Sequence, residues 1–136
     1  MKKVKQKKKL KSLPKLKAEA QTLCNEYIRR RDEGKPCITC GGYVKLEAGH
    51  FYPVKTYDGL RYELDNIHGE CHYDNCFNDF HLISYQNNLI NRIGAERMAI
   101  LKQKAEEYKI NGHKFSRSEL LDIITQFKQL IAELPP

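Results

Sequence analysis

The sequence predicts an α+β domain in which a small core, held together by metal-binding cysteines, is flanked by an N-terminal helix and by C-terminal helices. Apolar residues recur every three or four positions at both ends of the chain, which is typical of amphipathic helices. Between them, residues 36–69 read as short segments punctuated by glycine, as in a small sheet. Four of the five cysteines form two close pairs within or just after this region, which favours metal binding over disulfides.

The composition excludes a membrane protein. The chain has 136 residues, of which 40% are hydrophobic and 30% are charged, enough for one compact domain with appendages. No stretch approaches the ~20 apolar residues of a membrane span. The basic start is followed by KSLPKLK and not by an apolar segment, so a secretory signal is not expected. We expect a cytoplasmic protein without a membrane partner.

The positive charge of the chain is concentrated in its first residues. Lys and Arg number 24 against 17 Asp and Glu, and the opening MKKVKQKKKLK holds seven of the lysines and no acid. The remaining 17 basic and 17 acidic residues cancel. Such a run is not expected to fold alone. Residues 1–12 are therefore predicted to be a basic arm, which either solubilises the protein or binds the phosphates of nucleic acid.

Residues 13–34 are predicted to form an amphipathic helix. Ser12 and Pro14 are typical of a helix start, and Gly34 is a typical end. Cys24 lies beside the apolar stripe, so we expect it to be buried and not to bind metal. Three arginines crowd the last turn, where cations complement the helix dipole and where they could also contact phosphates.

Residues 35–94 are predicted to form the core, and residues 95–136 a helical extension. Short strands are expected at Tyr43–Leu46, His50–Val54 and Leu60–Leu64, and helical periodicity resumes after about Cys71. The extension holds one helix over about 95–109 and another after Ser116, which has the capping-box spacing to an acid three residues later. These helices carry enough apolar surface for the contact of a homodimer.

The cysteine pairs predict a structural zinc site. Cys37 and Cys40 have the spacing of a metal knuckle and precede two glycines, while Cys71 and Cys76 would close the site from a distant segment. A site made only of thiolates selects Zn²⁺ and leaves no coordination position open for water. The alternative is that the four are small buried residues.

His50, Asn66 and the cysteine frame resemble the HNH, or ββα-metal, nucleases. More closely, the segments YIRRRDEGKPCITCGG, LEAGHFYPV, LRYELDNIHGECHYDN and YQNNLINRIGAER resemble the NinG/Rap recombination protein family of lambda-like phages. The resemblance covers about residues 24–100. Its specific part consists of the strings AGHFYPV and LRYxxxNIHGxC.

This resemblance implies a metal-dependent, structure-selective endonuclease that cuts branched double-stranded DNA, such as Holliday junctions and D-loops, in phage recombination. His50 would be the base that activates water. A catalytic Mg²⁺ or Mn²⁺ would bridge the scissile phosphate and the leaving oxygen. Asn66 would span the loop and help to orient the histidine. A two-fold junction needs two cuts, so a homodimer is expected.

The sequence offers two candidates for the fourth zinc ligand, Asp74 and Cys76. In the HNH pattern, the residue nine after the middle asparagine is a metal ligand and directly follows the fourth zinc cysteine. Counting from Asn66 places Asn75 at the ligand position, but Asp74 and not cysteine precedes it. Either Asp74 completes the zinc site or the chain bulges so that Cys76 reaches it. Thiolate preference favours Cys76.

The sequence also offers more than one candidate ligand for the catalytic cation. Asp79 lies four residues after Asn75, on one face of a helix. If the chain bulges so that Cys76 binds zinc, the spacing favours His81, five residues after Cys76, instead. Many HNH enzymes place a further ligand before the histidine, where this chain has Gly49. The other histidines, at positions 68, 72 and 113, are expected at the surface.

No base-reading element is obvious, whereas cations for the DNA backbone are plentiful, so recognition by shape is expected. The predicted phosphate contacts are Lys2, Lys3, Lys5, Lys7, Lys8, Lys9, Lys11, Arg29, Arg30, Arg31, Lys55 and Arg61. The alternative function is a non-catalytic zinc module that binds nucleic acid or a phage partner.

Overall fold

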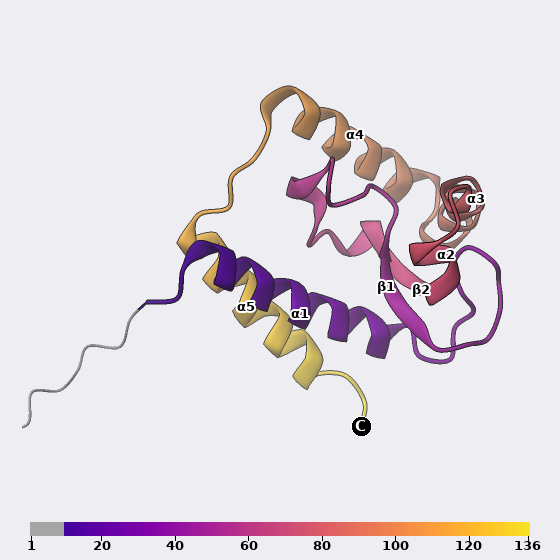
Figure 1. Cartoon of the computed structure of the whole chain (residues 1–136), viewed down its shortest axis with the longest axis horizontal. Helices are drawn as coiled ribbons and strands as arrows, with labels where there is room; N and C mark the ends of the chain where they lie inside the picture. Colours follow the sequence, from indigo (N-terminus) through magenta and orange to yellow (C-terminus); the bar gives the residue numbers. More distant parts are fainter. Residues whose placement is uncertain (1–9) are drawn as a thin grey trace, which may run out of the picture.

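A two-stranded antiparallel sheet surrounded by helices forms the fold in the computed structural model, which describes residues 10–136 (Figure 1). The elements are α1 (Leu13–Arg31), β1 (Leu46–His50), β2 (Ile67–Cys71), α2 (His72–Cys76), α3 (His81–Ile93), α4 (Ala95–Asn111) and α5 (Arg117–Ala132). Two single-turn 3₁₀ helices, η1 (Asp58–Leu60) and η2 (Leu64–Asn66), lie between the strands. The predicted α+β class is confirmed.

Helix α1 begins where the sequence predicts. The Ser12 hydroxyl accepts a hydrogen bond from the backbone N–H of Lys15 at 3.4 Å, and a proline occupies the first turn. The helix ends at Arg31, a few residues before the predicted boundary, because Asp32 caps it and the chain then turns through Gly34 at φ 83°.

Helix α5 lies beside α1 along most of its length (Figure 1). Leu16 and Ala20 of α1 pack against Leu120 and Ile124 of α5, and further along α1 the apolar side chains meet Phe127. Ser116 caps α5 by accepting a hydrogen bond from the Glu119 N–H at 3.1 Å, as the spacing predicts. The last helix therefore packs against the first.

The strands differ from those predicted. Leu46 pairs with Cys71 and His50 pairs with Ile67, so the second strand is IHGEC and not residues 60–64. The expected strands at 43–46, 50–54 and 60–64 are wrong, except that Leu46 and His50 are the two ends of β1. Residues 51–66 form a folded loop with the 3₁₀ turns, and β2 is buried although its sequence is polar, because its side chains are hydrogen-bonded.

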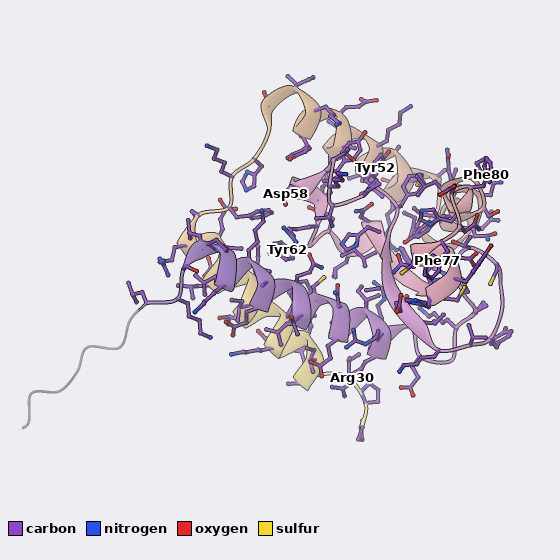
Figure 2. The ribbon with its side chains drawn as sticks, viewed as in Figure 1. Arg30, Tyr52, Asp58, Tyr62, Phe77 and Phe80 are labelled. Atoms are coloured by element: carbon purple, nitrogen blue, oxygen red, sulfur yellow. The ribbon has the colours of Figure 1, made fainter. Side chains whose placement is uncertain are left out.

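The β1–β2 loop lies between α1 and α4. Figure 2 shows Tyr52, Asp58 and Tyr62 in this region, above α1. The Tyr62 hydroxyl donates to the Lys17 carbonyl at 2.8 Å, and the Asp58 carboxylate lies 2.7 Å from the Lys17 ammonium. These contacts fasten the loop to the first helix.

The two faces of β1 contact different parts of the molecule, because successive strand residues point to opposite sides. Ala48 packs into the cluster that contains Cys24 and Ile28 of α1. Gly49 lies on the other side, where its carbonyl accepts from the Tyr85 hydroxyl of α3 at 2.7 Å. His50 therefore shares the side of Ala48, toward α1.

A separate apolar cluster joins the first cysteine knuckle to the helices after it. It contains Ile38 of the knuckle, buried residues of α3 and α4, and two partly buried rings: Tyr85, Leu89, Ile93, Met98, Leu101, Phe51 and Tyr52. No helix within residues 10–136 combines the length and apolarity needed to cross a bilayer.

Candidate metal centre and surrounding site

Cys37, Cys40, Cys71 and Asp74 each offer one ligand atom, and these four atoms all lie within 4.8 Å of one another. The sulfurs of Cys40 and Cys71 are 4.0 Å apart, and the Oδ2 atom of Asp74 lies 3.0 Å from the Cys71 sulfur and 3.5 Å from that of Cys37. Zn–S bonds of about 2.3 Å place neighbouring sulfurs of a tetrahedral site about 3.8 Å apart. The donor set therefore fits a zinc ion, and we name it the Cys₃Asp cluster.

Backbone amides support the sulfurs of the Cys₃Asp cluster. Gly41, at φ 74°, lets the knuckle turn tightly. The Cys37 sulfur accepts from the backbone N–H of Cys40 at 3.5 Å and from that of Cys71 at 3.2 Å. Burial, together with the neighbouring thiol and carboxyl, raises the pKa of Cys71 to about 12. A bound cation would offset this by favouring the thiolate.

The structure corrects the preference for Cys76 as fourth ligand. Helix α2 begins directly after Cys71, without a bulge. A residue three positions on, Asp74, returns to the same side of the helix, whereas Cys76 is turned away. Cys76 instead lies near Glu47 and His72.

The half-buried His50 has one ring nitrogen fixed. Nε2 lies 3.0 Å from the carbonyl oxygen of Arg61. A carbonyl only accepts hydrogen bonds, so Nε2 carries the proton and Nδ1 is the basic nitrogen. Burial lowers the pKa of His50, and the nearby guanidinium of Arg61 adds to this effect. The ring is therefore a neutral imidazole at pH 7.

Asn66 is fully buried and holds the β1–β2 loop together. Its amide oxygen accepts from the backbone N–H of Tyr52 at 2.8 Å, and its amide nitrogen donates to the carbonyls of Tyr52 at 3.1 Å and Leu60 at 3.3 Å. This bridging places Arg61, next to Leu60, where its carbonyl meets His50.

The expected cation ligands do not gather around His50. Asn75 donates to the Glu47 carboxylate at 3.1 Å, and Nδ1 of His81 lies 2.8 Å from a carboxylate oxygen of Glu70. Asp79 is exposed in the turn after α2, which ends at Cys76, so Asp79 does not share a helix face with Asn75. His50 lies on the opposite side of β1, toward α1, which accounts for the separation.

Glu70 is a polar residue of this region that the sequence analysis missed. It is fully buried, and its Oε2 atom contacts the Thr39 hydroxyl and His81. Among the described residues, Oε1 of Glu70 has no hydrogen-bond partner. A Cβ at Gly49 would approach Cβ of Glu70 to 2.8 Å and its carboxylate more closely still. The only available signal was an acidic residue directly before Cys71.

Two of the expected phosphate contacts are engaged within the protein. Arg31 bonds the carboxylate of Asp32, the carbonyl of Ile67 and the ring of His68. Asp32 is buried, which by itself would raise its pKa, but Arg31 and the Gly69 N–H lower the pKa to about 2. Arg61 bonds Gln21 and Asp58 and is mostly covered. The prediction that Arg31 and Arg61 are free to hold phosphates is therefore wrong.

Other predicted DNA contacts are exposed. Arg29, Arg30 and Lys55 reach solvent, while Lys11 lies 2.8 Å from the carboxylate of Glu19. The other six predicted contacts lie outside the described residues: Lys2, Lys3, Lys5, Lys7, Lys8 and Lys9.

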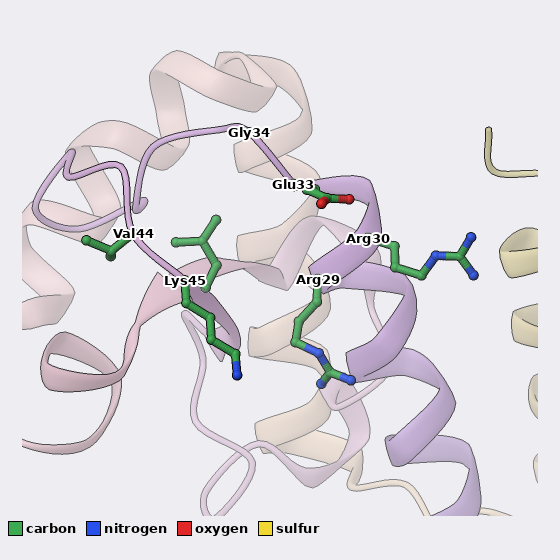
Figure 3. A pocket seen from close by; sticks show the side chains of 7 residues that line it. Arg29, Arg30, Glu33, Gly34, Val44 and Lys45 are labelled. Carbon is green, nitrogen blue, oxygen red and sulfur yellow. The ribbon is translucent and has the colours of Figure 1, made fainter. Parts of the chain in front are cut away.

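A pocket of about 330 Å³ opens at the end of α1. Figure 3 shows Arg29 of α1 and Lys45, just before β1, on facing sides of it with their side chains pointing the same way, whereas Arg30 points away. Glu33 is the one acid of the lining. Two cations that line one small pocket suit a phosphate group, and Lys45 was missed because it stands alone in the sequence.

Two of the three histidines expected at the surface are exposed, and the third is buried. His72 and His113 are exposed, as predicted. His68 is buried, and the prediction for it is wrong. Its Nε2 lies 3.0 Å from the Asp65 carbonyl, while its Nδ1 accepts from Arg31 at 3.3 Å, so the ring is neutral. Burial, with the charge of Arg31, lowers the pKa of His68 to about 4.

Comparison with known proteins identifies similar sequences. Residues 1–135 match the sequence model of a family described as "Bacteriophage Lambda NinG protein". "Protein ninG" of Escherichia phage 933W is 33% identical over 118 residues, which cover 85% of this chain and 56% of that protein. The proteins of the same name from Escherichia phage lambda and Salmonella phage P22 are 32% and 31% identical over 118 residues.

The chain spans about half the length of the curated relatives that it matches. No solved structure matches it.

Proposed function

Because the chain belongs to the NinG family of lambda-like phages, we propose that it is a divalent-metal-dependent endonuclease that cuts branched DNA during phage recombination. The observation that carries this proposal is the geometry of His50, whose Nε2 is fixed by the Arg61 carbonyl on a hairpin that carries a donor of the Cys₃Asp cluster, while burial lowers the pKa of its ring. Hydrolysis of a phosphodiester needs a base for water, and a neutral imidazole is suited to that role.

In this proposal, His50 receives the proton of the attacking water at Nδ1. The Arg61 carbonyl keeps Nε2 protonated and fixes the plane of the ring. Asn66 acts as a positioning residue, since it bridges Tyr52 and Leu60 on the loop that carries this carbonyl. The lowered pKa keeps the base form present at neutral pH.

A catalytic Mg²⁺ or Mn²⁺ would stabilise charge on the phosphate and the leaving oxygen. Glu70 and His81 offer an oxygen and an imidazole for such an ion, and Oε1 of Glu70 is buried with no hydrogen-bond partner among residues 10–136. Both lie across β1 from His50, so a phosphate shared by this ion and the base requires the hairpin to shift when DNA binds. We propose His81 as the helix ligand, with Asn75 and Asp79 as the weaker candidates.

Branched DNA would be held mainly through its phosphates. The pocket with Arg29 and Lys45 provides a phosphate-sized cationic site, and the exposed Arg30 and Lys55 add further contacts. The basic arm of residues 1–12 would add attraction that does not depend on sequence.

Exposed aromatic rings support a preference for branched substrates. Tyr73, Phe77 and Phe80 are 65%, 67% and 76% exposed, and both phenylalanines lie at the α2–α3 end of the molecule (Figure 2). Unpaired or frayed bases stack on such rings irrespective of sequence. A junction offers these bases more readily than an intact duplex does.

The second candidate function is a non-catalytic, zinc-held module that binds branched DNA. One observation favours it: within residues 10–136, His50 belongs to neither of the two groups of metal-type donors. In that case, the cations and aromatic rings would bind DNA and the histidine would serve the structure of the loop.

Cleavage of a four-way DNA junction in Mg²⁺ or Mn²⁺ tests these alternatives. We expect His50→Ala to lower the cleavage rate by about 10²-fold or more, because a general base is lost, while junction binding stays intact. His113→Ala is the matched control, since His113 is exposed and lies outside the site.

Equal cleavage by the wild type and His50→Ala would contradict the role of His50. Binding without cleavage by the wild-type chain, across several branched substrates and both metals, would establish the non-catalytic module instead.

A further inference from the structure

Cys76, which the Cys₃Asp cluster leaves out, lies in a second group of donors on the outer side of α2. Its sulfur is 3.6 Å from Nδ1 of His72 and 3.9 Å from Oε1 of Glu47, and Oε2 of Glu47 is 2.8 Å from the same His72 nitrogen. We propose that Glu47, His72 and Cys76 form a second metal site, which takes Zn²⁺ or a similar divalent transition-metal ion.

The separations of these donors suit one tetrahedral ion. Bonds of about 2.3 Å to sulfur and about 2.0–2.2 Å to nitrogen or oxygen place neighbouring ligand atoms about 3.4–3.6 Å apart. The distance from Cys76 to His72 has this value, and the carboxylate of Glu47 is near it. Glu47 and His72 are closer because a hydrogen bond joins them, and an ion would replace that bond.

Three features of the fold bring these side chains together. His72 and Cys76 are four residues apart in α2, so they share one face of the helix. The ladder pairs Leu46 with Cys71, which puts Glu47 of β1 beside the start of α2. The Asn75 amide donates to Glu47 at 3.1 Å and thereby orients the carboxylate, as outer partners of metal ligands commonly do.

The second site differs in kind from the Cys₃Asp cluster. Three protein ligands leave one coordination position for water or another small ligand, whereas four close the site. The side chains of Glu47 and His72 are 40% and 64% exposed, so an ion can reach them from solvent. A thiolate and an imidazole disfavour Mg²⁺ and select a softer ion, so this site is distinct from the proposed catalytic cation.

An ion here would also stabilise α2. This helix has five residues, too few for an isolated helix to persist in water. Its Cys71–Asp74 side is held by the Cys₃Asp cluster, and the second ion would fasten its other side to β1.

Counting bound ions tests the proposal on the full chain. The protein is saturated with Zn²⁺, exchanged into metal-free buffer and analysed for zinc per chain. We expect two ions for the wild type and one each for His72→Ala and Cys76→Ser. The matched control is His113→Ala, because His113 also pairs with an exposed carboxylate, that of Glu119 at 2.7 Å, but has no thiol beside it. It should keep two ions.

Co²⁺ substitution provides a second readout, because thiolate-to-cobalt charge transfer reports each sulfur ligand. The absorption spectrum of the Co²⁺-loaded wild type should contain a charge-transfer band that Cys76→Ser lacks. Circular dichroism checks that both proteins are folded. A wild-type chain with one ion, or variants with as many ions as the wild type, would overturn the second site. The readout is metal content, so it is independent of any DNA cleavage.

Discussion

At the scale of single residues, burial decides the protonation of the histidines. His50, His68 and His113 carry the same ring, but His68 is buried, His50 is half-buried and His113 is exposed. The buried rings are neutral, since leaving water penalises the imidazolium form. Burial therefore favours the base form of His50 and of His68 near neutral pH.

The buried His68 should make the stability of the protein depend on pH. Its pKa is about 4 in the folded chain and about 6.5 when unfolded, so the unfolded state takes up the proton first. Stability should therefore fall as the pH drops from about 6.5 to about 4, by about 3 kcal/mol in total. Urea unfolding of wild type and His68→Gln across this range measures the effect.

The glutamine can still donate to the Asp65 carbonyl, but it does not titrate. The Cys₃Asp cluster would lose metal in acid in both proteins, so only the difference between their curves reports on His68. Parallel curves for the two proteins would contradict the assignment.

At the scale of elements, the short helix α2 separates the donors of the two candidate metal sites. It carries Asp74 on one side and Cys76 on another, and it links the hairpin to α3. Because the helix turns by about 100° per residue, a shift of two positions separates a donor of the Cys₃Asp cluster from a residue outside it.

Asp74→Asn should weaken zinc binding by the Cys₃Asp cluster by about tenfold or more, since it replaces a charged ligand. Asp79→Asn is the matched control, because Asp79 is a nearby exposed carboxylate in the turn after α2. Competition with a chromophoric chelator measures both affinities. If the two variants lose affinity equally, or if neither does, Asp74 is not the fourth ligand.

At the scale of the whole molecule, the basic charge is unevenly placed. The chain carries +7, and the arm at the N-terminus accounts for all of it. The first described residues continue into α1, next to α5 (Figure 1). A phosphate backbone bound along the folded part would thus meet additional cations from the arm.

Deletion of residues 1–9 should weaken binding to every DNA shape and flatten its salt dependence. Six lysines are removed, and each phosphate that the protein no longer neutralises reduces the slope of log K against log salt by about 0.9. The deletion leaves Lys11, whose carbonyl accepts from Arg117, in place. Titrations of duplex and junction at several salt concentrations measure the slope, and an unchanged slope would make the arm a solubilising tail.

We also propose a homodimer, because a two-fold junction needs two cuts.

The sequence by itself determined what depends on neighbours along the chain. The starts of α1 and α5 follow from Ser12 and Ser116, and the burial of Cys24 follows from its place beside the apolar stripe. The spacing of Cys37 and Cys40 indicated a metal knuckle, and specific strings indicated the family. Each of these signals spans only a few residues, so the residues themselves carry it.

Only the tertiary structure decided which distant residues meet. The pairing of β1 with IHGEC, the choice of Asp74 over Cys76, and the inward position of Arg31 depend on contacts between residues that are at least 17 positions apart. Strand register and the rotation of a helix set those contacts, and a shift of one residue changes the face on which every side chain lies. Local periodicity does not contain that information.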